Sequence, residues 1–352
     1  MGSGRPPGRC LRRGRALWHH ACVAPLRVLE FVRYDDGIWN LPRVHVDALA
    51  AEFPSVRFDS PADRAAADRL LPEADVVLGW GVRRANFASA TRLRWIQLTA
   101  AGVGGVLFPE MVESPVIVTN ARGLHAVSMA EHTIGVILMF ARKLHLARDA
   151  QSRHRWSQDE QWGEPPPFGQ LAGSTLGIVG FGAVGRALAE RARAFGLRVL
   201  AVRRHPAGDP APAHEQWGPD RLPDLLQRSD WLVLAAPLTP ATRGIIGPAE
   251  LALMPGHAIL VNLGRGALVD EAALTEALAA GRIAGAALDV FQEEPLPAGS
   301  PLWSMPNVIV TPHVSGFGPE YWDRVTALFR RNLRAFLDGR PLENVVDKRA
   351  GY

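Results

Sequence analysis

Short apolar runs alternate with longer amphipathic stretches along most of this chain of 352 residues. Apolar runs without polar alternation are typical of strands buried on both faces, as in a parallel sheet covered by helices on each side. The alternation therefore predicts an α/β fold. The runs expected to form strands are RVLEFV (27–32), DVVLGW (75–80), RWIQLT (94–99), VIVTN (116–120), TLGIVG (175–180), LRVLAV (197–202), WLVLAA (231–236), AILVNL (258–263), GAALDV (285–290) and NVIVTPH (307–313).

The intervening stretches have helical periodicity. Residues 127–148 form one long pattern that is apolar over much of its circumference. We expect a single helix there, buried at an interface between domains or subunits. Glycines that favour helix ends follow two of the other patterns, at Gly196 and Gly339. These other predicted helices cover residues 183–195, 270–281 and 319–338.

Composition excludes several classes of protein. Hydrophobic residues make up 47% of the chain and charged residues 21%, which is ordinary for a globular protein. The longest apolar run, around Thr133 to Phe140, is too short to cross a bilayer. Both cysteines, Cys10 and Cys22, lie near the start, so we expect no disulfide framework, no cysteine nucleophile and no metal site. A cytoplasmic protein without a membrane partner is the resulting expectation.

The formal net charge of +4 comes from one region. Six arginines precede the first acidic residue, Glu30. Without these six, 33 of the 39 Lys and Arg residues remain, against 35 Asp and Glu residues. The rest of the chain is therefore slightly acidic, and we expect no nucleic-acid partner. Residues 1–24 are basic and free of acids, which suits a transit peptide or a basic extension without regular structure, and we favour the extension. The six arginines that precede the first acid are Arg5, Arg9, Arg12, Arg13, Arg15 and Arg27.

A glycine motif connects a predicted strand to a predicted helix in GIVGFGAVG, residues 177–185. Gly180 allows the tight turn after the strand, and Gly182 lets the backbone approach a pyrophosphate. Gly185 lets the helix pack closely on the strand. The helix N-terminus then offers N–H groups to the phosphates of a dinucleotide. The spacing alone is weak evidence, but here it has the strand and helix that a dinucleotide site requires.

Two arginines follow the next strand, where a site for NAD(H) has an acid that accepts from the ribose 2′-hydroxyl. Arg203 and Arg204 cannot accept that hydrogen bond, and their guanidinium groups can bind a 2′-phosphate. The sequence therefore predicts that NADP(H) is preferred, with NAD(H) still possible.

Reactive side chains gather after the later strands, at the edge where a doubly wound sheet binds ligands. They lie in NLGRGALVDE (262–271), LDVFQEEPL (288–296) and TPHVSG (311–316). With these motifs, residues 75–348 resemble the D-2-hydroxyacid dehydrogenase family. The resemblance also includes WIQLTAAGVGGV (95–106), NARGLHAVSMAEH (120–132) and GRPLENVVD (339–347). Within that family, the two arginines make the chain most similar to the NADPH-using glyoxylate and hydroxypyruvate reductases.

The resemblance implies a catalytic set of Arg265, Glu294 and His313. It places the substrate carboxylate on the backbone N–H groups of Ala101 and Gly102, beside Arg265. One departure is Gly104, where relatives often have a polar residue. Around the cofactor the resemblance places Ala183, Val184, Pro237, Thr242, Leu263 and Asp289, in addition to the three glycines.

These residue types suit the reduction of a 2-keto acid, which needs a hydride at the carbonyl carbon and a proton at its oxygen. A nicotinamide supplies the hydride. His313 can donate the proton near neutral pH, and a carboxylate beside it, Glu294, would favour the protonated ring and orient it. Arg265 can bind the substrate carboxylate and polarise the carbonyl.

The predicted architecture is a doubly wound Rossmann cofactor domain inserted into a smaller, flavodoxin-like α/β substrate domain. The cofactor domain would cover residues 122–314, and the substrate domain residues 25–121 and 315–352. We expect the cleft between the domains to close by hinge motion. We also expect a homodimer, from the long helical pattern at 127–148 and from the family resemblance. Two alternatives remain open: an NAD(P)H-sensing regulatory protein, like the corepressors that share this fold, and an NAD-dependent dehydrogenase that oxidises D-2-hydroxy acids.

Overall fold

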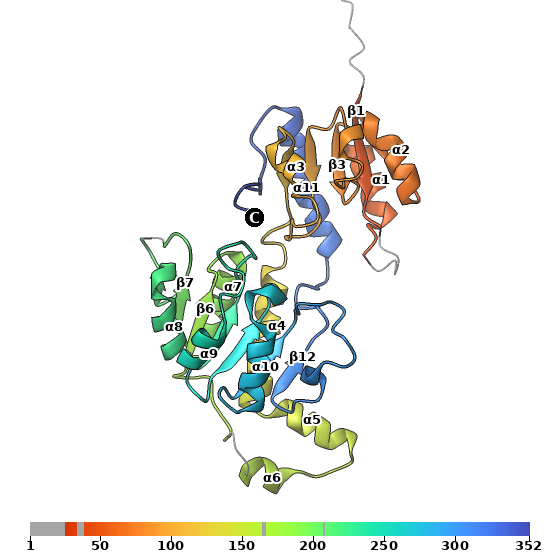
Figure 1. The fold of residues 1–352 in the computed structure, drawn as a ribbon. Helices are drawn as coiled ribbons and strands as arrows, with labels where there is room; N and C mark the ends of the chain where they lie inside the picture. The colour runs from red at the N-terminus through yellow and green to blue at the C-terminus, as the bar shows by residue number, and fades with distance from the viewer. Residues whose placement is uncertain (1–24, 34–38, 164–166, 207) are drawn as a thin grey trace, which may run out of the picture.

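The computed structural model describes residues 25–33, 39–163, 167–206 and 208–352 (Figure 1). The predicted basic extension, with both cysteines, lies outside the described residues. In the described part the chain forms two parallel sheets of five and seven strands with helices packed on their faces. This arrangement confirms the predicted α/β class with a doubly wound sheet and a second, smaller α/β unit.

The five-stranded sheet has the order β2-β1-β3-β4-β5, and all its pairs are parallel. This is the flavodoxin-like order. A late helix returns to cover it, because Trp95 in β4 stacks on Phe329 of α11 with ring centres 5.3 Å apart. The elements of this unit are β1 (Leu26–Phe31), α1 (Arg43–Glu52), β2 (Val56–Asp59), α2 (Arg64–Leu70), β3 (Val76–Gly79), β4 (Trp95–Gln97), α3 (Pro109–Glu113), β5 (Ile117–Thr119) and α11 (Tyr321–Leu337).

The seven-stranded sheet has the order β12-β11-β10-β9-β6-β7-β8, again with every pair parallel. The strand order reverses between β6 and β9, so a ligand crevice is expected outside the carboxyl ends of these two strands. Its elements are α4 (Ala126–Ala141), α5 (Leu144–Ser152), α6 (Gln158–Gly163), β6 (Thr175–Val179), α7 (Ala183–Ala194), β7 (Arg198–Val202), β8 (Glu215–Trp217), α8 (Leu222–Arg228), β9 (Trp231–Leu234), α9 (Pro248–Leu253), β10 (Ile259–Asn262), α10 (Glu271–Ala279), β11 (Gly285–Leu288) and β12 (Val308–Val310).

One predicted helix is wrong in its extent. The pattern at 127–148 predicts a single helix, but the structure has two, α4 and α5, separated at Arg142 and Lys143. Lys143 adopts a left-handed backbone with φ of 52°. Its side chain is buried, and its ammonium donates to the carbonyl of Gln161 at 2.5 Å. The apolar periodicity continues across this break and therefore does not reveal it.

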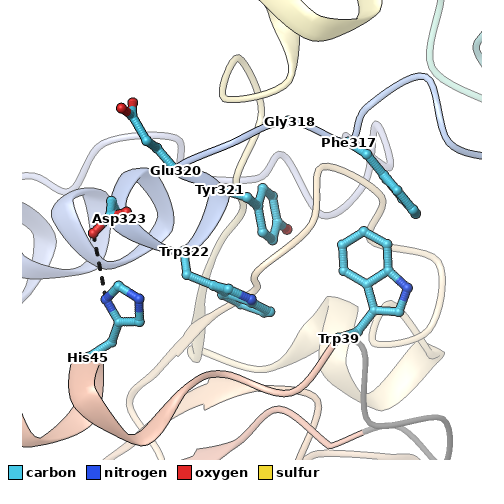
Figure 2. Close-up of a pocket in the computed structure, with 8 residues that line it drawn as sticks. All are labelled: Trp39, His45, Phe317, Gly318, Glu320, Tyr321, Trp322 and Asp323. Atoms are coloured by element: carbon cyan, nitrogen blue, oxygen red, sulfur yellow. Dashed lines mark ion pairs between the residues drawn. The ribbon is translucent and has the colours of Figure 1, made fainter.

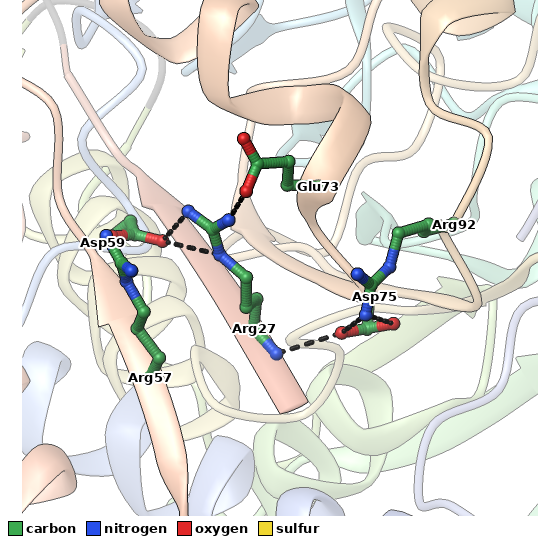
Figure 3. Close-up of polar contacts among 6 residues, drawn as sticks. All are labelled: Arg27, Arg57, Asp59, Glu73, Asp75 and Arg92. Atoms are coloured by element: carbon green, nitrogen blue, oxygen red, sulfur yellow. Dashed lines mark hydrogen bonds and ion pairs between the residues drawn. The ribbon is translucent and has the colours of Figure 1, made fainter. Parts of the chain in front are cut away.

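Ion pairs and hydrogen bonds join Arg27, near the start of β1, to Asp59 at the end of β2 and to residues that precede β3 (Figure 3). Arg27, at the start of β1, pairs with Asp59 in β2 at 2.9 Å and also with Glu73. The backbone N–H of Arg27 donates to Asp75 at 2.9 Å, and Arg92 donates to the same carboxylate at 3.1 Å. Arg27 and Asp59 are nearly buried, so these contacts are less screened by solvent than an exposed pair.

The chain passes between the two sheets twice, from β5 to α4 and from β12 to α11 (Figure 1). Both crossings start at the carboxyl end of a strand, so they run beside the loops that carry the predicted site residues.

Within the described residues, no helix combines the length and apolar character needed to cross a membrane.

Candidate active site

The glycine motif forms a tight turn between β6 and α7. Gly180 has a φ of 98°, and a Cβ there would lie 2.5 Å from the backbone nitrogen of Ala236. A Cβ on Gly185 would lie 2.6 Å from the carbonyl of Gly180, so this glycine keeps the helix close to the turn. Gly182 is exposed, and a Cβ there would have no neighbour within 4 Å. The motif thus leaves open backbone at the start of α7, where N–H groups lack helical partners, which fits a dinucleotide pyrophosphate.

The two arginines lie just after β7. Arg203 is half-buried, and its backbone N–H donates to the carbonyl of Trp217 at 3.0 Å. Arg204 is exposed, and its Nη1 donates to the hydroxyl of Tyr352 at 2.7 Å. Neither arginine forms an ion pair with a carboxylate in the described part of the chain. Their guanidinium groups therefore have donors for a further anionic group.

Ala183 and Val184 begin α7, and the other predicted cofactor residues lie in the loops after β9, β10 and β11. Thr242 donates its hydroxyl to the carbonyl of Pro237 at 2.7 Å, which closes the loop after β9. Leu263 is buried in the hydrophobic core. Asp289 is buried and accepts from the hydroxyl of Thr311 at 2.6 Å. It also accepts from two backbone N–H groups of the following loop, those of residues 314 and 315 at 2.9 and 3.0 Å.

Asp289 therefore has a structural contribution that the sequence did not reveal: it orders the loop that carries His313. The contacts of Ala183, Val184, Pro237, Thr242, Leu263 and Asp289 with a cofactor stay predictions.

His313 and Glu294 lie together, as predicted. The imidazole Nδ1 is 2.7 Å from Oε2 of Glu294, whose Oε1 accepts the backbone N–H of Phe291 at 3.0 Å. Because a carboxylate accepts, Nδ1 carries a proton, and Nε2 is left as the nitrogen that can exchange a proton with a substrate. His313 follows β12 rather than ending it, and its φ of 54° is left-handed. Such a backbone in a non-glycine residue is typical of functional sites.

Arg265 faces the predicted carboxylate-binding turn from the other sheet. Its guanidinium lies directly against Gly102, so close that a Cβ on this glycine would overlap it. Arg265 also donates to the carbonyl of Gly264 at 2.7 Å, and the side-chain amide of Asn262 donates to its own carbonyl at 3.0 Å. Asn120 holds the facing turn by donating to the carbonyl of Ala101 at 2.8 Å. The structure thus brings together residues of the loops after β4 and β10, which only the family resemblance implied to be neighbours.

Two residues near this cluster, His125 and Tyr321, lie outside the set of site residues that the sequence predicts. His125 precedes α4, and burial lowers the pKa of its imidazole below the ordinary 6.5. The hydrogen bond of His125 to the carbonyl of Gly316 opposes that decrease in pKa. The positive charges of Arg265 and His313 lower the pKa further, so His125 lies within electrostatic reach of both. Tyr321, at the start of α11, stacks on His125 with ring centres 5.2 Å apart.

Aromatic side chains form a cavity of about 310 Å³ beside Tyr321 (Figure 2). Trp39 and Phe317 meet edge to face with ring centres 4.2 Å apart, and Trp322 points toward the same space.

Among the described residues no group of three or more His, Cys, Asp or Glu side chains is placed to hold a metal ion.

Comparison with known proteins identifies the family. Residues 134–315, more than half of the chain, match the family model of the NAD binding domain of D-isomer specific 2-hydroxyacid dehydrogenases. This chain belongs to the D-isomer specific 2-hydroxyacid dehydrogenase family. The resemblance found in the sequence is thereby confirmed, and the protein is an oxidoreductase with a nicotinamide cofactor.

Curated relatives and a solved structure agree with this family. A glyoxylate reductase of Aeropyrum pernix is 37% identical over 268 residues, which cover 74% of this chain and 78% of that protein. A D-3-phosphoglycerate dehydrogenase of Methanocaldococcus jannaschii is 36% identical over 280 residues, 79% of this chain. The match spans only 52%, about half, of that longer relative.

Among solved structures of the family, the NADPH-dependent glyoxylate/hydroxypyruvate reductase of Sinorhizobium meliloti, in complex with NADP and sulfate, superposes with a TM-score of 0.78. It is 29% identical, and the superposition covers 93% of this chain and 100% of that chain.

Proposed function

We propose that this protein reduces small 2-keto acids of the glyoxylate and hydroxypyruvate type to D-2-hydroxy acids, with NADPH as hydride donor. The observation that carries the proposal is the position of Arg265 against Gly102, with the His313–Glu294 pair on a neighbouring loop of the same sheet edge. A carboxylate binder and a proton donor at one crevice are what a 2-keto acid requires. The glyoxylate reductases among the relatives support the same substrate class.

Each residue has a role in this reaction. The bound nicotinamide supplies the hydride. Arg265 and the N–H groups of Ala101 and Gly102 bind the substrate carboxylate, and the charge of Arg265 polarises the adjacent carbonyl. His313 delivers a proton from Nε2 to the carbonyl oxygen as the alkoxide forms. Glu294 holds Nδ1 of the ring and so keeps Nε2 directed at the substrate.

Arg203 and Arg204 favour NADPH over NADH. Each can form charge-assisted hydrogen bonds with the 2′-phosphate, and neither can accept from the 2′-hydroxyl of NADH. The NADP-bound relative of S. meliloti is consistent with this preference.

The two sheets form separate domains that move about the two crossings. The substrate domain consists of residues 25–121 and 315–352, and the cofactor domain of residues 122–314. Because the candidate site takes Gly102 from one unit and Arg265 from the other, closure would bring the carboxylate-binding groups together and exclude water from the hydride transfer.

A homodimer in the cytoplasm is part of the proposal. Helices α5 and α6 project from the seven-stranded sheet (Figure 1). Two large apolar side chains on this projection are exposed. Trp156 is 88% exposed and Trp162 is 81% exposed. Tryptophan is enriched at protein interfaces, so a second copy of this chain is the occupant that we expect on the α5–α6 projection.

Steady-state assays test the proposed function. Glyoxylate, hydroxypyruvate, pyruvate and a bulkier 2-keto acid are each assayed with NADPH and with NADH, and the matching D-hydroxy acids with NADP and NAD. We expect the highest kcat/KM for a small keto acid with NADPH. Tight cofactor binding without turnover of any of these acids would instead favour the regulatory protein, and faster oxidation with NAD would favour the catabolic dehydrogenase.

A further inference from the structure

The two segments that cross between the sheets are packed against each other. The first crossing contains His125, and its ring lies beside the second crossing at Gly316, where a Cβ would be 3.2 Å from Nδ1. Ser128 lies three residues after His125 in α4, and a Cβ on Gly318 of the second crossing would overlap its hydroxyl. Two glycines of the second crossing thus allow a close approach that larger residues would prevent.

His125 makes a directed contact with the loop that carries the candidate proton donor. Its Nδ1 lies 3.1 Å from the carbonyl oxygen of Gly316, three residues after His313. A carbonyl can only accept, so Nδ1 of His125 is the donor. The buried position and the nearby charge of Arg265 disfavour a second proton on this ring. His125 therefore serves as a neutral hydrogen-bond donor.

Tyr321 extends this contact to the other side of the site. Its ring stacks on that of His125 at an interplanar angle of 23°. Its hydroxyl donates to the carbonyl of Thr99, two residues before the Ala101–Gly102 turn. A continuous chain of contacts therefore runs from the His313 loop through His125 and Tyr321 to the turn that faces Arg265.

We propose that His125 and Tyr321 are positioning residues that hold the proton-donor loop and the carboxylate-binding turn in register with each other. This inference rests on the proposed function, because it assigns the His313 loop and the Ala101–Gly102 turn, which these contacts connect, to the reduction of a 2-keto acid. Neither residue touches the reacting atoms. They set the geometry in which His313 and the turn meet one substrate, and a small displacement of such groups slows a reaction strongly.

Three single variants separate the contributions of the His125 hydrogen bond, the His125 ring and the Tyr321 hydroxyl. His125→Phe keeps a stacking ring and removes the donor, His125→Asn keeps a donor and removes the ring, and Tyr321→Phe removes only the hydroxyl. His145 is the matched control: its Nδ1 also lies 3.1 Å from a backbone carbonyl, that of Met139, and its ring packs against Phe140. His145→Phe thus removes the same kind of contact away from the site.

Kinetics are measured with the keto acid and cofactor that the unmodified protein uses best. We expect His125→Phe and Tyr321→Phe each to lower kcat/KM for the keto acid by about tenfold, as expected for one lost hydrogen bond, while KM for the cofactor stays within about twofold. The double variant that combines His125→Phe with Tyr321→Phe should lose little more activity than either single variant, because both residues belong to the same series of contacts. His125→Asn should recover part of the loss, and His145→Phe should behave like the parent.

Amide hydrogen exchange of the full chain gives a readout that does not depend on turnover. Exchange should rise in both 99–106 and 314–318 in His125→Phe, and in neither segment in His145→Phe. Additive losses in the double variant, or an exchange change confined to the residues around position 125, would overturn the inference. A parent that turns over no 2-keto acid refutes the proposed function instead, and the exchange data still decide whether the two segments are coupled.

Discussion

Arg204 donates a 2.7 Å hydrogen bond to the hydroxyl of Tyr352, although 148 positions separate the two residues. Arg204 follows β7 in the seven-stranded sheet, whereas the segment that carries Tyr352 is anchored on the five-stranded sheet. Val346 donates its N–H to Val118, and the ammonium of Lys348 donates to the carbonyl of Met111 at 2.9 Å. The contact therefore connects the two sheets at the point where the ribose phosphate of NADPH is expected to bind.

The first prediction concerns cofactor preference. The unmodified protein should have a higher kcat/KM with NADPH than with NADH, and Arg203→Asp should reverse the order, because an acid accepts from the 2′-hydroxyl and repels the 2′-phosphate. Arg193→Asp, which makes the same charge change on the outer side of α7, is the control and should leave the ratio unchanged. A tenfold preference of the parent for NADH would contradict the assignment of both arginines.

The second prediction concerns the candidate acid. His313→Ala should lower kcat by about a hundredfold or more with little change in cofactor affinity, because it removes the proton donor and not the cofactor cradle. Glu294→Gln should have a milder effect, since its amide oxygen can still accept from Nδ1. Stopped-flow reduction under single-turnover conditions measures the chemical step directly. A His313→Ala protein with parental single-turnover rates would remove this residue from the mechanism.

The third prediction separates folding from cofactor binding within the glycine motif. Gly182 has an extended backbone with φ of −88° and open space around it, so Gly182→Ala should fold normally and bind NADPH more weakly. Gly180→Ala should lower the melting temperature, because its left-handed backbone and the nearby Ala236 leave no room for a methyl group. Calorimetry and NADPH titration of both variants test the contrast. Equal melting temperatures for the two variants would contradict it.

A fourth prediction concerns assembly. If α5 and α6 contact a second copy, the double substitution Trp156→Ser and Trp162→Ser should shift the dimer toward monomer at low micromolar concentration, as measured by light scattering. Trp303→Ser is the control, since Trp303 is also exposed but lies outside the projection. A parent protein that is monomeric at all accessible concentrations would refute the dimer.

The fifth prediction concerns the pH dependence of stability. Burial lowers the pKa of His125, His132 and His145 below the ordinary 6.5 in the folded state. The unfolded chain therefore binds more protons once the pH falls below about 6.5, and the free energy of unfolding should decrease as the pH is lowered through this value. Urea denaturation at about pH 7.5 and pH 5.5 measures the decrease. His145→Phe should reduce it, and an unchanged slope would contradict the assignment to buried histidines.

The sequence predicted the buried strands well, because both faces of a central strand carry apolar residues. The runs at 175–180 and 231–236 became β6 and β9 with ends within two residues. Two of the four edge strands, β2 and β8, were missed. Their residues, VRFD and EQW, are few and partly polar, so no apolar run marks them, whereas the edge strands β5 and β12 have the apolar sequences IVT and VIV.

Some contacts of the candidate site could be predicted from the sequence, and others could not. The proximity of His313 and Glu294 was implied by family motifs, and the structure has them in contact. The pairing of His125 with Gly316 and of Tyr321 with Thr99 joins segments far apart in the chain. Such contacts depend on how the two sheets are placed, and no local pattern of residues encodes that placement.

The return of α11 to the five-stranded sheet has a consequence for how the chain is made. Phe329 and Leu333 of this helix belong to the same core cluster as Val28 and Trp95, yet α11 follows every strand that the structure describes. During synthesis, β1 to β5 leave the ribosome long before the helix that completes their core. The inserted seven-stranded unit has all its strands in one continuous stretch and can fold first. Until α11 is made, the early strands therefore keep exposed the apolar surface that Phe329 and Leu333 cover in the folded protein.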